Sequence, residues 1–372
     1  MRKGFIFLQF AISLSLVLCS IIIEKELYYI RNTETGVDRD NVVMIPFHKM
    51  VHYAAFKREV EALPGIAAAA TSHYPMYGGM DGLAVKGPGA DKAVQVFMMH
   101  VDDGFISLLG LQWQDKPVDE GVLGDGKHWI LNETAVRTLG ISGDPIGQSL
   151  DIAGDKQQVA GVLKDFNYGS LRSKIGSLGI LIDRDTASTW GGMSGCLLGK
   201  IKTHVNIPAT VDAIRKIFSK YDKQTAFEFD FADEAFDRQY KAEDRLAGLF
   251  GMFTVITVMI ACLGLFALAT FSAQQRVKEI GIRKVMGASA ASIGGLLSRD
   301  FLRPVLLAVV IAWPLSWLVM NRWLEDFTYR TDVPWWIFVL AGLGLLGVSL
   351  ATVLFRSLRA ARGNPVDALR SE

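Results

Sequence analysis

The stretch SAQQRVKEIGIRKVMGAS, residues 272–289, lies between two apolar segments that are each long enough to cross a lipid bilayer. Its Lys and Arg side chains favour the cytoplasmic side, because short cytoplasmic loops carry an excess of positive charge. Apolar residues recur in it at steps of three and four, as in an amphipathic helix. Such a helix either lies on the lipid surface or docks into a groove on a cytosolic partner.

Four segments of the chain have the length and apolar composition of membrane spans. They are residues 5–23, 246–271, 301–320 and 335–355. Basic side chains precede the first span, separate the second from the third, and follow the fourth. With four spans, all three basic clusters fall on one face of the membrane, which is then the cytoplasmic face. Residues 24–245 are therefore expected on the opposite side.

The first apolar run has a second interpretation. Arg2 and Lys3 before an apolar stretch resemble the start of a secretory signal. However, Leu18 stands before Cys19 where a lipoprotein site has a small residue, and no Ala-x-Ala cleavage site follows. We therefore expect the run to be retained as a transmembrane helix that continues through residues 24–31.

The composition fits a chain that is part membrane protein and part soluble domain. It is 50% hydrophobic, with a mean hydropathy of +0.27 and a net charge of +1. A net charge near zero gives no support to nucleic-acid binding. Cys19 and Cys262 lie in apolar segments, which leaves Cys196 alone in the polar region and makes an intrachain disulfide unexpected.

The polar region alternates strand and helix patterns at both of its ends. Strands are expected at residues 42–46, 66–71, 195–201 and 226–231. Residues 49–63 and 208–221 are expected to form the intervening helices. Two such βαβ units indicate one split α/β lobe of the ferredoxin-like type. The expected fold class is thus a membrane α-helical part with four transmembrane helices plus an α/β domain outside it.

A β-rich insertion, residues 74–190, separates the two units and is expected to form a second lobe. Its expected strands are residues 94–101, 129–131, 149–152 and 158–164. Asn132 is expected to cap a short helix that runs through Leu139. Beyond the insertion, residues 233–271 contain no proline and predict one continuous helix. Such a helix is either a rigid stalk that transmits movement or a simple tether.

Three patterns resemble catalytic or metal sites, and none is complete. Residues 121–128 nearly match a phosphate-binding loop, but His128 stands where Ser or Thr must hold magnesium. His48 and His52 are one helical turn apart, without a third ligand nearby in the sequence. Cys196 lies in an apolar strand with no nominated base. We therefore predict no enzyme activity, no cofactor and no metal.

The spans contain almost no ionisable residues, which argues against a proton- or ion-coupled carrier. They do contain small residues at helical spacing, which permit close packing between helices. The predicted packing positions are Ala308, Ala312 and Ser316 on the third span and Gly347 and Ala351 on the fourth.

Residues 261–267 and 275–289 together closely resemble the FtsX-like permease family of ABC transporters. The C-terminal residues 361–370 also look like that family's ending. The outer region resembles the MacB-like periplasmic core domain. The matching pieces there are residues 131–135, 144–147 and 161–166. The resemblance divides the chain into transmembrane helix 1 (1–23), a periplasmic domain (24–245) and an FtsX-like domain (246–372) with a cytoplasmic coupling segment (272–300).

The resemblance implies a mechanism and a set of partners. Permeases of this family pair with a separate cytosolic ABC ATPase, and their dimers carry ATP-driven closure to the periplasmic domains by mechanotransmission. The amphipathic segment would be the coupling helix that docks on the ATPase. Its apolar contacts would come from Ile280, Ile282, Val285 and Met286. Its orientation would be set by Arg276, Lys278, Glu279, Arg283 and Lys284, with Gly287 completing the segment.

The resemblance also implies a multi-pass protein of the cell inner membrane that contacts lipid and works as a homodimer or with a second permease half. A periplasmic or outer-membrane partner and an unidentified exported or released substrate would complete the system. The opening residues look like the start of the second half of longer, eight-span permeases, so the chain is expected to be a half-unit or a fragment. The main alternative is a membrane-anchored regulator or receptor of an envelope protein such as a cell-wall hydrolase.

Overall fold

The computed structural model describes residues 2–48, 50, 52–124, 126–183, 195–275, 286 and 290–361. The chain divides into two compact units. We call the first, Met1–Arg31 with Lys241–Glu372, the helical unit, and the second, Asn32–Tyr240, the sheet unit.

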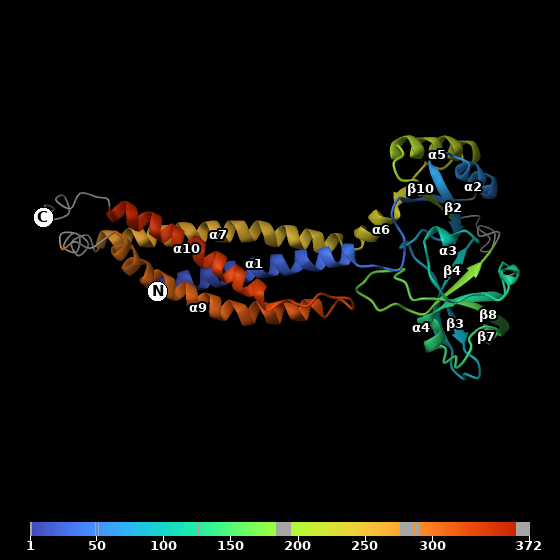
Figure 1. Ribbon diagram of the computed structural model, residues 1–372, viewed down its shortest axis with the longest axis horizontal. Coiled ribbons are helices and arrows are strands. Elements are labelled where there is room, and N and C mark those ends of the chain that lie inside the picture. The colour runs from blue at the N-terminus through green and yellow to red at the C-terminus, as the bar shows by residue number, and fades with distance from the viewer. Residues whose placement is uncertain are drawn as a thin grey trace. The chain divides into compact units, whose positions relative to one another are not determined.

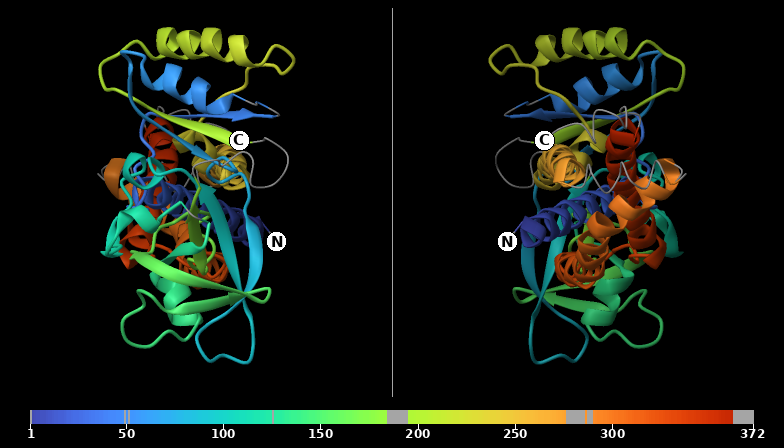
Figure 2. Two further views of the ribbon diagram at one scale, coloured as in Figure 1. Left: turned by 90° about the vertical axis from the view of Figure 1, so that its right-hand side faces the viewer. Right: turned by 90° about the vertical axis from the view of Figure 1, so that its left-hand side faces the viewer.

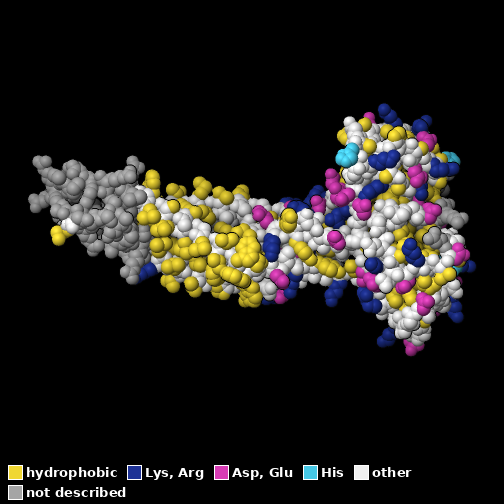
Figure 3. All heavy atoms as spheres, in the orientation of Figure 1, with side chains coloured by type: hydrophobic (Ala, Val, Ile, Leu, Met, Phe, Trp, Pro, Cys, Tyr) yellow, Lys and Arg dark blue, Asp and Glu magenta, His cyan; other side chains and the backbone are white. Residues whose placement is uncertain are grey.

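Four long helices make up the described part of the helical unit and lie side by side in it (Figure 1). They are α1 (Arg2–Asn32), α7 (Lys241–Gln275), α9 (Ala290–Leu324) and α10 (Trp335–Ala361). Among the described residues, these four are long and apolar enough to cross a membrane. Hydrophobic side chains cover their outward faces, as lipid-facing helices require (Figure 3). The first of them continues to Asn32, as the sequence predicted.

The expectation of one continuous helix from Asp233 to Phe271 is wrong. A short helix, α6 (Ala232–Arg238), ends before α7 begins at Lys241. The amides of Gln239 and Tyr240 donate to the carbonyls of Phe236 and Asp237, three residues back, which tightens and closes the last turn. Tyr240 is only 1% exposed, so its burial fixes the chain at this break.

The sheet unit contains a single sheet of described strands. The strands are β1 (Val42–Phe47), β2 (Ile66–Ser72), β3 (Asp81–Lys86), β4 (Val94–Val101), β5 (Trp113–Asp115), β6 (His128–Asn132), β7 (Ser149–Ile152), β8 (Asp155–Leu163), β9 (Leu178–Ile182), β10 (Gly195–Ile201) and β11 (Asp230–Phe231). The helices are α2 (Tyr53–Glu61), α3 (Phe105–Leu108), α4 (Glu133–Thr138), α5 (Ile207–Tyr221) and α6, with a 3₁₀ turn η1 at Glu120–Val122.

The first lobe of the sheet has the order β11-β1-β10-β2, with every neighbouring pair antiparallel. Helices α2 and α5 lie together on one face of it (Figure 2). Their apolar sides, including Phe56 and Phe218, pack with Val43 and Leu197 of the strands into one core cluster. The order and the one-sided helices are compatible with the predicted ferredoxin-like lobe.

The second lobe is a closed ring of strands. The order runs β4-β3-β7-β8-β6-β9, and β9 pairs back onto β4 in parallel. Closure leaves no free edge in this ring, and β5 pairs outside it with β8. Trp129 is 1% exposed in a core cluster of this lobe, and its ring occupies the place where a side chain on Gly179 would begin. The glycine is therefore required by the tryptophan.

Several boundaries differ from the sequence expectations. The predicted strand at residues 226–231 is reduced to Asp230–Phe231, and just before it the rings of Phe227 and Phe229 stack on each other with centroids 5.8 Å apart. The helix expected at residues 49–63 is Tyr53–Glu61 in the described residues. Strand β9 was not predicted because all five of its residues are buried, so it shows no alternation of polar and apolar side chains.

Candidate functional site

The predicted coupling residues fall almost entirely outside the described residues. Helix α7 is described to Gln275 and α9 from Ala290. The predicted positions that lie outside are Arg276, Lys278, Glu279, Ile280, Ile282, Arg283, Lys284, Val285 and Gly287. Met286 is described, and its side chain is 83% exposed. The ATPase-docking role of the segment therefore stays a prediction.

The two predicted stripes of small residues lie in different surroundings. Ala308, Ala312 and Ser316 are at most 1% exposed in α9, which packs against α10. Beside this stripe, the Trp313 ring nitrogen donates to the Phe338 carbonyl at 3.0 Å. Gly347 and Ala351 are exposed on α10 instead, and open space surrounds Gly347. Packing of a helix at that second stripe stays a prediction.

Polar contacts join α1 to its neighbours near the C-terminal end of this helix. Glu26 is fully buried and accepts hydrogen bonds from the Thr331 amide at 2.9 Å and the Thr331 hydroxyl at 2.8 Å. The Lys25 ammonium donates to the Asp332 carbonyl at 2.6 Å. Arg31 forms an ion pair with Asp244 of α7 at 2.6 Å. Glu26 was not among the predicted site residues, although a carboxylate next to a long apolar run is unusual enough to mark it.

The chain enters the sheet unit at Asn32 and leaves it at Tyr240. The segments at both of these ends form hydrogen bonds to one loop, residues 165–171. At the entry, the Asn167 amide donates to the Thr35 carbonyl at 2.7 Å. At the exit, the Leu171 amide donates to the Tyr240 hydroxyl oxygen at 2.7 Å. We call this loop, with Thr35, Gly36 and Tyr240, the junction. Asn32 and Tyr240 are the first and last residues of the sheet unit, so both covalent connections to the helices begin beside this loop.

The packing around the junction is close. Gly36 has a φ of +74°, which strains any other residue, and a side chain there would begin 3.0 Å from Cβ of Phe166, a tight contact. The rings of Phe236 and Tyr240 meet at 5.3 Å. Burial raises the pKa of Tyr240, which keeps its hydroxyl neutral at ordinary pH. The spacing of four between Phe236 and Tyr240 is the signal in the sequence that could have found this buried stripe.

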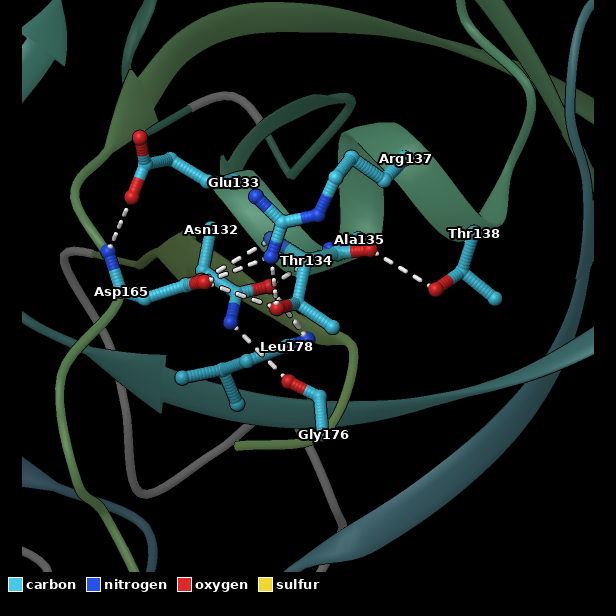
Figure 4. Close-up of polar contacts among 9 residues, drawn as sticks. All are labelled: Asn132, Glu133, Thr134, Ala135, Arg137, Thr138, Asp165, Gly176 and Leu178. Carbon is cyan, nitrogen blue, oxygen red and sulfur yellow. Dashed lines mark hydrogen bonds and ion pairs between the residues drawn. The ribbon is translucent and has the colours of Figure 1, made fainter. Parts of the chain in front are cut away.

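Asp165, at the start of the junction loop, ties it to helix α4 (Figure 4). Its carboxylate accepts from the Thr134 amide (2.9 Å), the Thr134 hydroxyl (2.8 Å) and the Arg137 guanidinium (2.9 Å). In return the Asp165 amide donates to the Glu133 carboxylate at 2.9 Å. Residues 131–135 (LNETA) supply one side of this hydrogen-bond network, and residues 161–166 (GVLKDF) supply the other. Both stretches therefore have a structural role.

Asn132 caps α4, as predicted, and also fixes strand β9 (Figure 4). Its side-chain oxygen accepts from the amides of Ala135 and Leu178, both at 2.9 Å. Its side-chain nitrogen donates to the Gly176 carbonyl at 2.9 Å. One buried amide therefore holds three elements of the second lobe together.

The remaining sequence patterns form no catalytic or metal centre in the described part of the chain. Cys196 is fully buried in β10, and burial raises the pKa of its thiol to about 12, so it is not a nucleophile near neutral pH. Within the described residues, no group of three or more His, Cys, Asp or Glu side chains could hold a metal ion. His128 begins strand β6 rather than a helix, unlike the end of a phosphate-binding loop.

Two family models match the chain. The model described as "MacB-like periplasmic core domain" matches residues 13–217, which is more than half of the sequence. The model described as "FtsX-like permease C-terminal" matches residues 251–365, which include all of α9 and α10 and most of α7.

Two curated relatives extend the likeness. An uncharacterized ABC transporter permease of Methanocaldococcus jannaschii is 21% identical over 345 residues, which cover 85% of this chain and 79% of that one. A Pseudomonas syringae protein named "Probable syringafactin export ATP-binding/permease protein" is 25% identical over 256 residues. Those residues cover 64% of this chain but only 37% of that protein.

Solved structures that resemble part of the chain include the periplasmic region of MacB from Actinobacillus actinomycetemcomitans, at 13% identity and a TM-score of 0.40. The aligned residues cover 54% of this chain and 92% of the MacB chain. The extracellular domain of a noncanonic ABC-type transporter from Gram-positive bacteria has 10% identity and a TM-score of 0.39, and covers 50% of this chain and 99% of its own. On its two family matches, this chain belongs to the FtsX-like permease family of ABC transporters, whose generally non-catalytic subunits pair with an ABC ATPase, and is a membrane protein with a MacB-like periplasmic core domain.

Proposed function

We propose that this chain is a permease subunit that couples ATP hydrolysis by a separate cytosolic ATPase to movement of its periplasmic domain. The movement serves export or envelope release of a substrate. The sheet unit is the moving part, and α1 and α7 are the elements that drive it. The protein lies in the cell inner membrane, with the 272–300 segment on the cytoplasmic side as the coupling segment.

The observation that carries this proposal is the junction. Asn167 binds the incoming segment at Thr35, and Leu171 binds the outgoing segment at Tyr240, only four residues apart in one loop. If the ends of α1 and α7 moved relative to one another, the force would therefore act on a single short loop. A passive tether needs no such convergence, because one flexible connection is enough to retain a domain.

The polar contacts of α1 support the same proposal. The Arg31–Asp244 ion pair joins the last turn of α1 to the first turn of α7. Glu26 and Lys25 join α1 to the segment between α9 and α10 through Thr331 and Asp332. Movement of any of these helices would reach the others through α1. Two copies of the chain, or this chain with a second permease half, would complete the membrane assembly, and export in the name of the Pseudomonas relative is in keeping with this role.

A pull-down from native membranes in mild detergent tests the partner. The normal chain is expected to co-purify with an ABC ATPase, and a double variant, Ile282→Asp with Met286→Asp, is expected to lose it. The control variant is Lys223→Asp, at an exposed position of the periplasmic domain. Leu249→Asp cannot serve as the control, because it would place a charge within a membrane span. If intact chain brings down envelope proteins and no ATPase, the protein is an anchored receptor or regulator and the proposal fails.

Hydrogen–deuterium exchange of the purified complex tests mechanotransmission directly. The amides of Asn167 and Leu171 are protected by the two junction bonds, so their exchange is expected to change when ATP with vanadate traps the ATPase. The Ala209 amide, which binds Asn206 at the start of α5, is the matched control and should not respond. Unchanged exchange at the junction in an ATP-hydrolysing complex would remove the mechanical part of the proposal.

A further inference from the structure

A cavity of about 470 Å³ opens within the sheet unit between α6, the edge strand β11 and the turn that follows β2. Its walls include Met44, Met76 and Phe229, of which the first two are at most 2% exposed. A cavity of this size with methionine and aromatic walls can hold a small organic molecule or one or two residues of a peptide.

One polar group in this cavity lacks a partner. Gln239 lines the cavity, and its buried side-chain nitrogen meets no hydrogen-bond acceptor among the described residues. A buried donor left unpaired is costly, and native proteins rarely retain one without a reason. An acceptor supplied by a ligand, such as a carbonyl oxygen, would satisfy it.

The charges at the cavity are unequal. Two carboxylates, Glu228 and Asp230, line it against the one guanidinium of Arg238. Arg238 is already engaged by Asp230, to which its Nη1 donates at 2.6 Å. Glu228 is exposed and forms no ion pair or hydrogen bond within the described ranges of the chain. Among the residues that line the cavity, the uncompensated charge is therefore negative, which favours a cation.

The turn that follows β2 forms the cavity wall that faces α6, and it contains a residue with a strained backbone. Tyr77 lines the cavity with a φ of +65°, which is rare for a bulky side chain. Its ring meets Phe236 edge-on at 5.4 Å, and the turn is closed by the Gly78 amide, which donates to the Pro75 carbonyl at 3.0 Å. Backbone strain of this kind persists where the surroundings impose it, and it gathers at ligand clamps.

From the free carboxylate, the unpaired amide donor and the apolar walls together, we propose that this cavity binds a ligand carrying an ammonium group beside a carbonyl on an apolar body. The ammonium pairs with Glu228, the carbonyl oxygen accepts from Gln239, and the apolar body lies between Met44, Met76 and Phe229. A peptide amino terminus has this chemistry, and so does a small amine-bearing amide. The binding does not depend on the proposed coupling to an ATPase.

The test uses the full chain in nanodiscs of zwitterionic phosphatidylcholine, with empty nanodiscs to correct for partition into lipid. Three fluorescent probes are compared by equilibrium dialysis. Leucine 2-naphthylamide carries both the ammonium and the carbonyl, its N-acetyl form lacks the ammonium, and a naphthylalkylamine lacks the carbonyl. The proposal expects saturable binding of the first probe at one site per chain, and at least fivefold weaker binding of the other two.

Two variants and one control locate the binding. Glu228→Gln and Gln239→Leu are each expected to weaken the binding of leucine 2-naphthylamide about fivefold, the size of one exposed ion pair or one hydrogen bond. Glu234→Gln makes the same charge change on an exposed residue of α6 that does not line the cavity, and should leave binding unchanged. Gln239→Leu should not lower the thermal unfolding temperature, because it removes an unpaired donor.

The outcomes separate cleanly. Binding that is lost with the N-acetyl probe and weakened by both variants supports the site. Binding no greater than that of empty nanodiscs overturns it. If neither Glu228→Gln nor Gln239→Leu weakens binding, the probe binds elsewhere and the proposal is overturned. If the carbonyl-free amine binds as tightly as leucine 2-naphthylamide, the role of Gln239 is overturned. Gln239→Leu with a lowered unfolding temperature would mean a structural role instead.

Discussion

The guanidinium carbon of Arg39 lies 4.1 Å from the centre of the Phe236 ring. Arg39 belongs to the segment by which the chain enters the sheet unit, and Phe236 belongs to α6, by which it leaves. Arg39 also donates to the Thr35 hydroxyl at 2.9 Å. A cation over an aromatic face thus joins the entry and exit segments beside the junction, in addition to the loop that both contact.

Replacement of this cation should loosen the entry segment. Arg39→Gln removes the charge over Phe236 and is expected to lower the free energy of unfolding of the sheet unit by about 1 kcal/mol. Pulse proteolysis of the full chain in urea measures this change. Arg39→Lys keeps the charge and should recover part of the loss, so equal losses in the two variants would argue against a cation–π contribution.

Loss of the buried carboxylate of α1 should weaken the helical unit. Glu26→Ala leaves the Thr331 amide and hydroxyl without their acceptor and is expected to cost about 2–3 kcal/mol. Thermal unfolding in detergent measures the effect. Glu24→Ala, two residues earlier on an exposed position of the same helix, is the matched control. A similar shift in both variants would contradict a specific role for Glu26.

The Asp165 carboxylate should be the dominant contact between the junction loop and α4. Asp165→Ala removes three hydrogen bonds, one of them to a guanidinium, and is expected to destabilise the sheet unit by about 2–4 kcal/mol. Asp165→Asn retains the shape and should cost less. Urea unfolding monitored by proteolysis distinguishes them, with the exposed Asp155→Asn as a control that should change stability by under about 0.5 kcal/mol.

Acid should destabilise the sheet unit through His100. Burial lowers the pKa of this side chain below the usual 6.5, with a further lowering from His73 against opposing contributions from Asp183 and Asp81. The unfolded chain therefore takes up a proton near pH 6.5, while the folded chain does so only at lower pH. Stability from this group is present above pH 6.5 and declines as the pH falls below it, by at most about 1.4 kcal/mol per pH unit.

Urea unfolding at pH 7.5 and 5.5 checks this expectation. The normal chain should lose more stability between the two pH values than His100→Gln does. Asp222 and Glu59, whose pKa values hydrogen bonds lower from 3.8 and 4.5, lose their stabilising contribution only as the pH falls below those values, so they do not interfere in this interval. An identical pH dependence in both chains would show that His100 does not contribute.

The two stripes of small residues on the membrane helices show how far a local sequence pattern predicts packing. The stripe of Ala308, Ala312 and Ser316 and the stripe of Gly347 and Ala351 look alike in sequence, yet the first is buried and the second exposed. Small residues permit close approach but do not select a partner. Which stripe is covered depends on how α9 and α10 are turned toward each other, and that is a property of the packed helices.

The sequence by itself determined the elements whose cause is local. Long apolar runs specified α1, α7, α9 and α10, alternation specified β4 and β7, and an asparagine before a helix specified the cap of α4. Only the tertiary structure decided the closed ring of strands, the break at Tyr240 and the junction, in which Thr35, Asn167 and Tyr240 meet from distant parts of the chain. The physical reason is that periodicity reports which face of an element is buried, whereas hydrogen bonds between distant segments form only once the chain has folded.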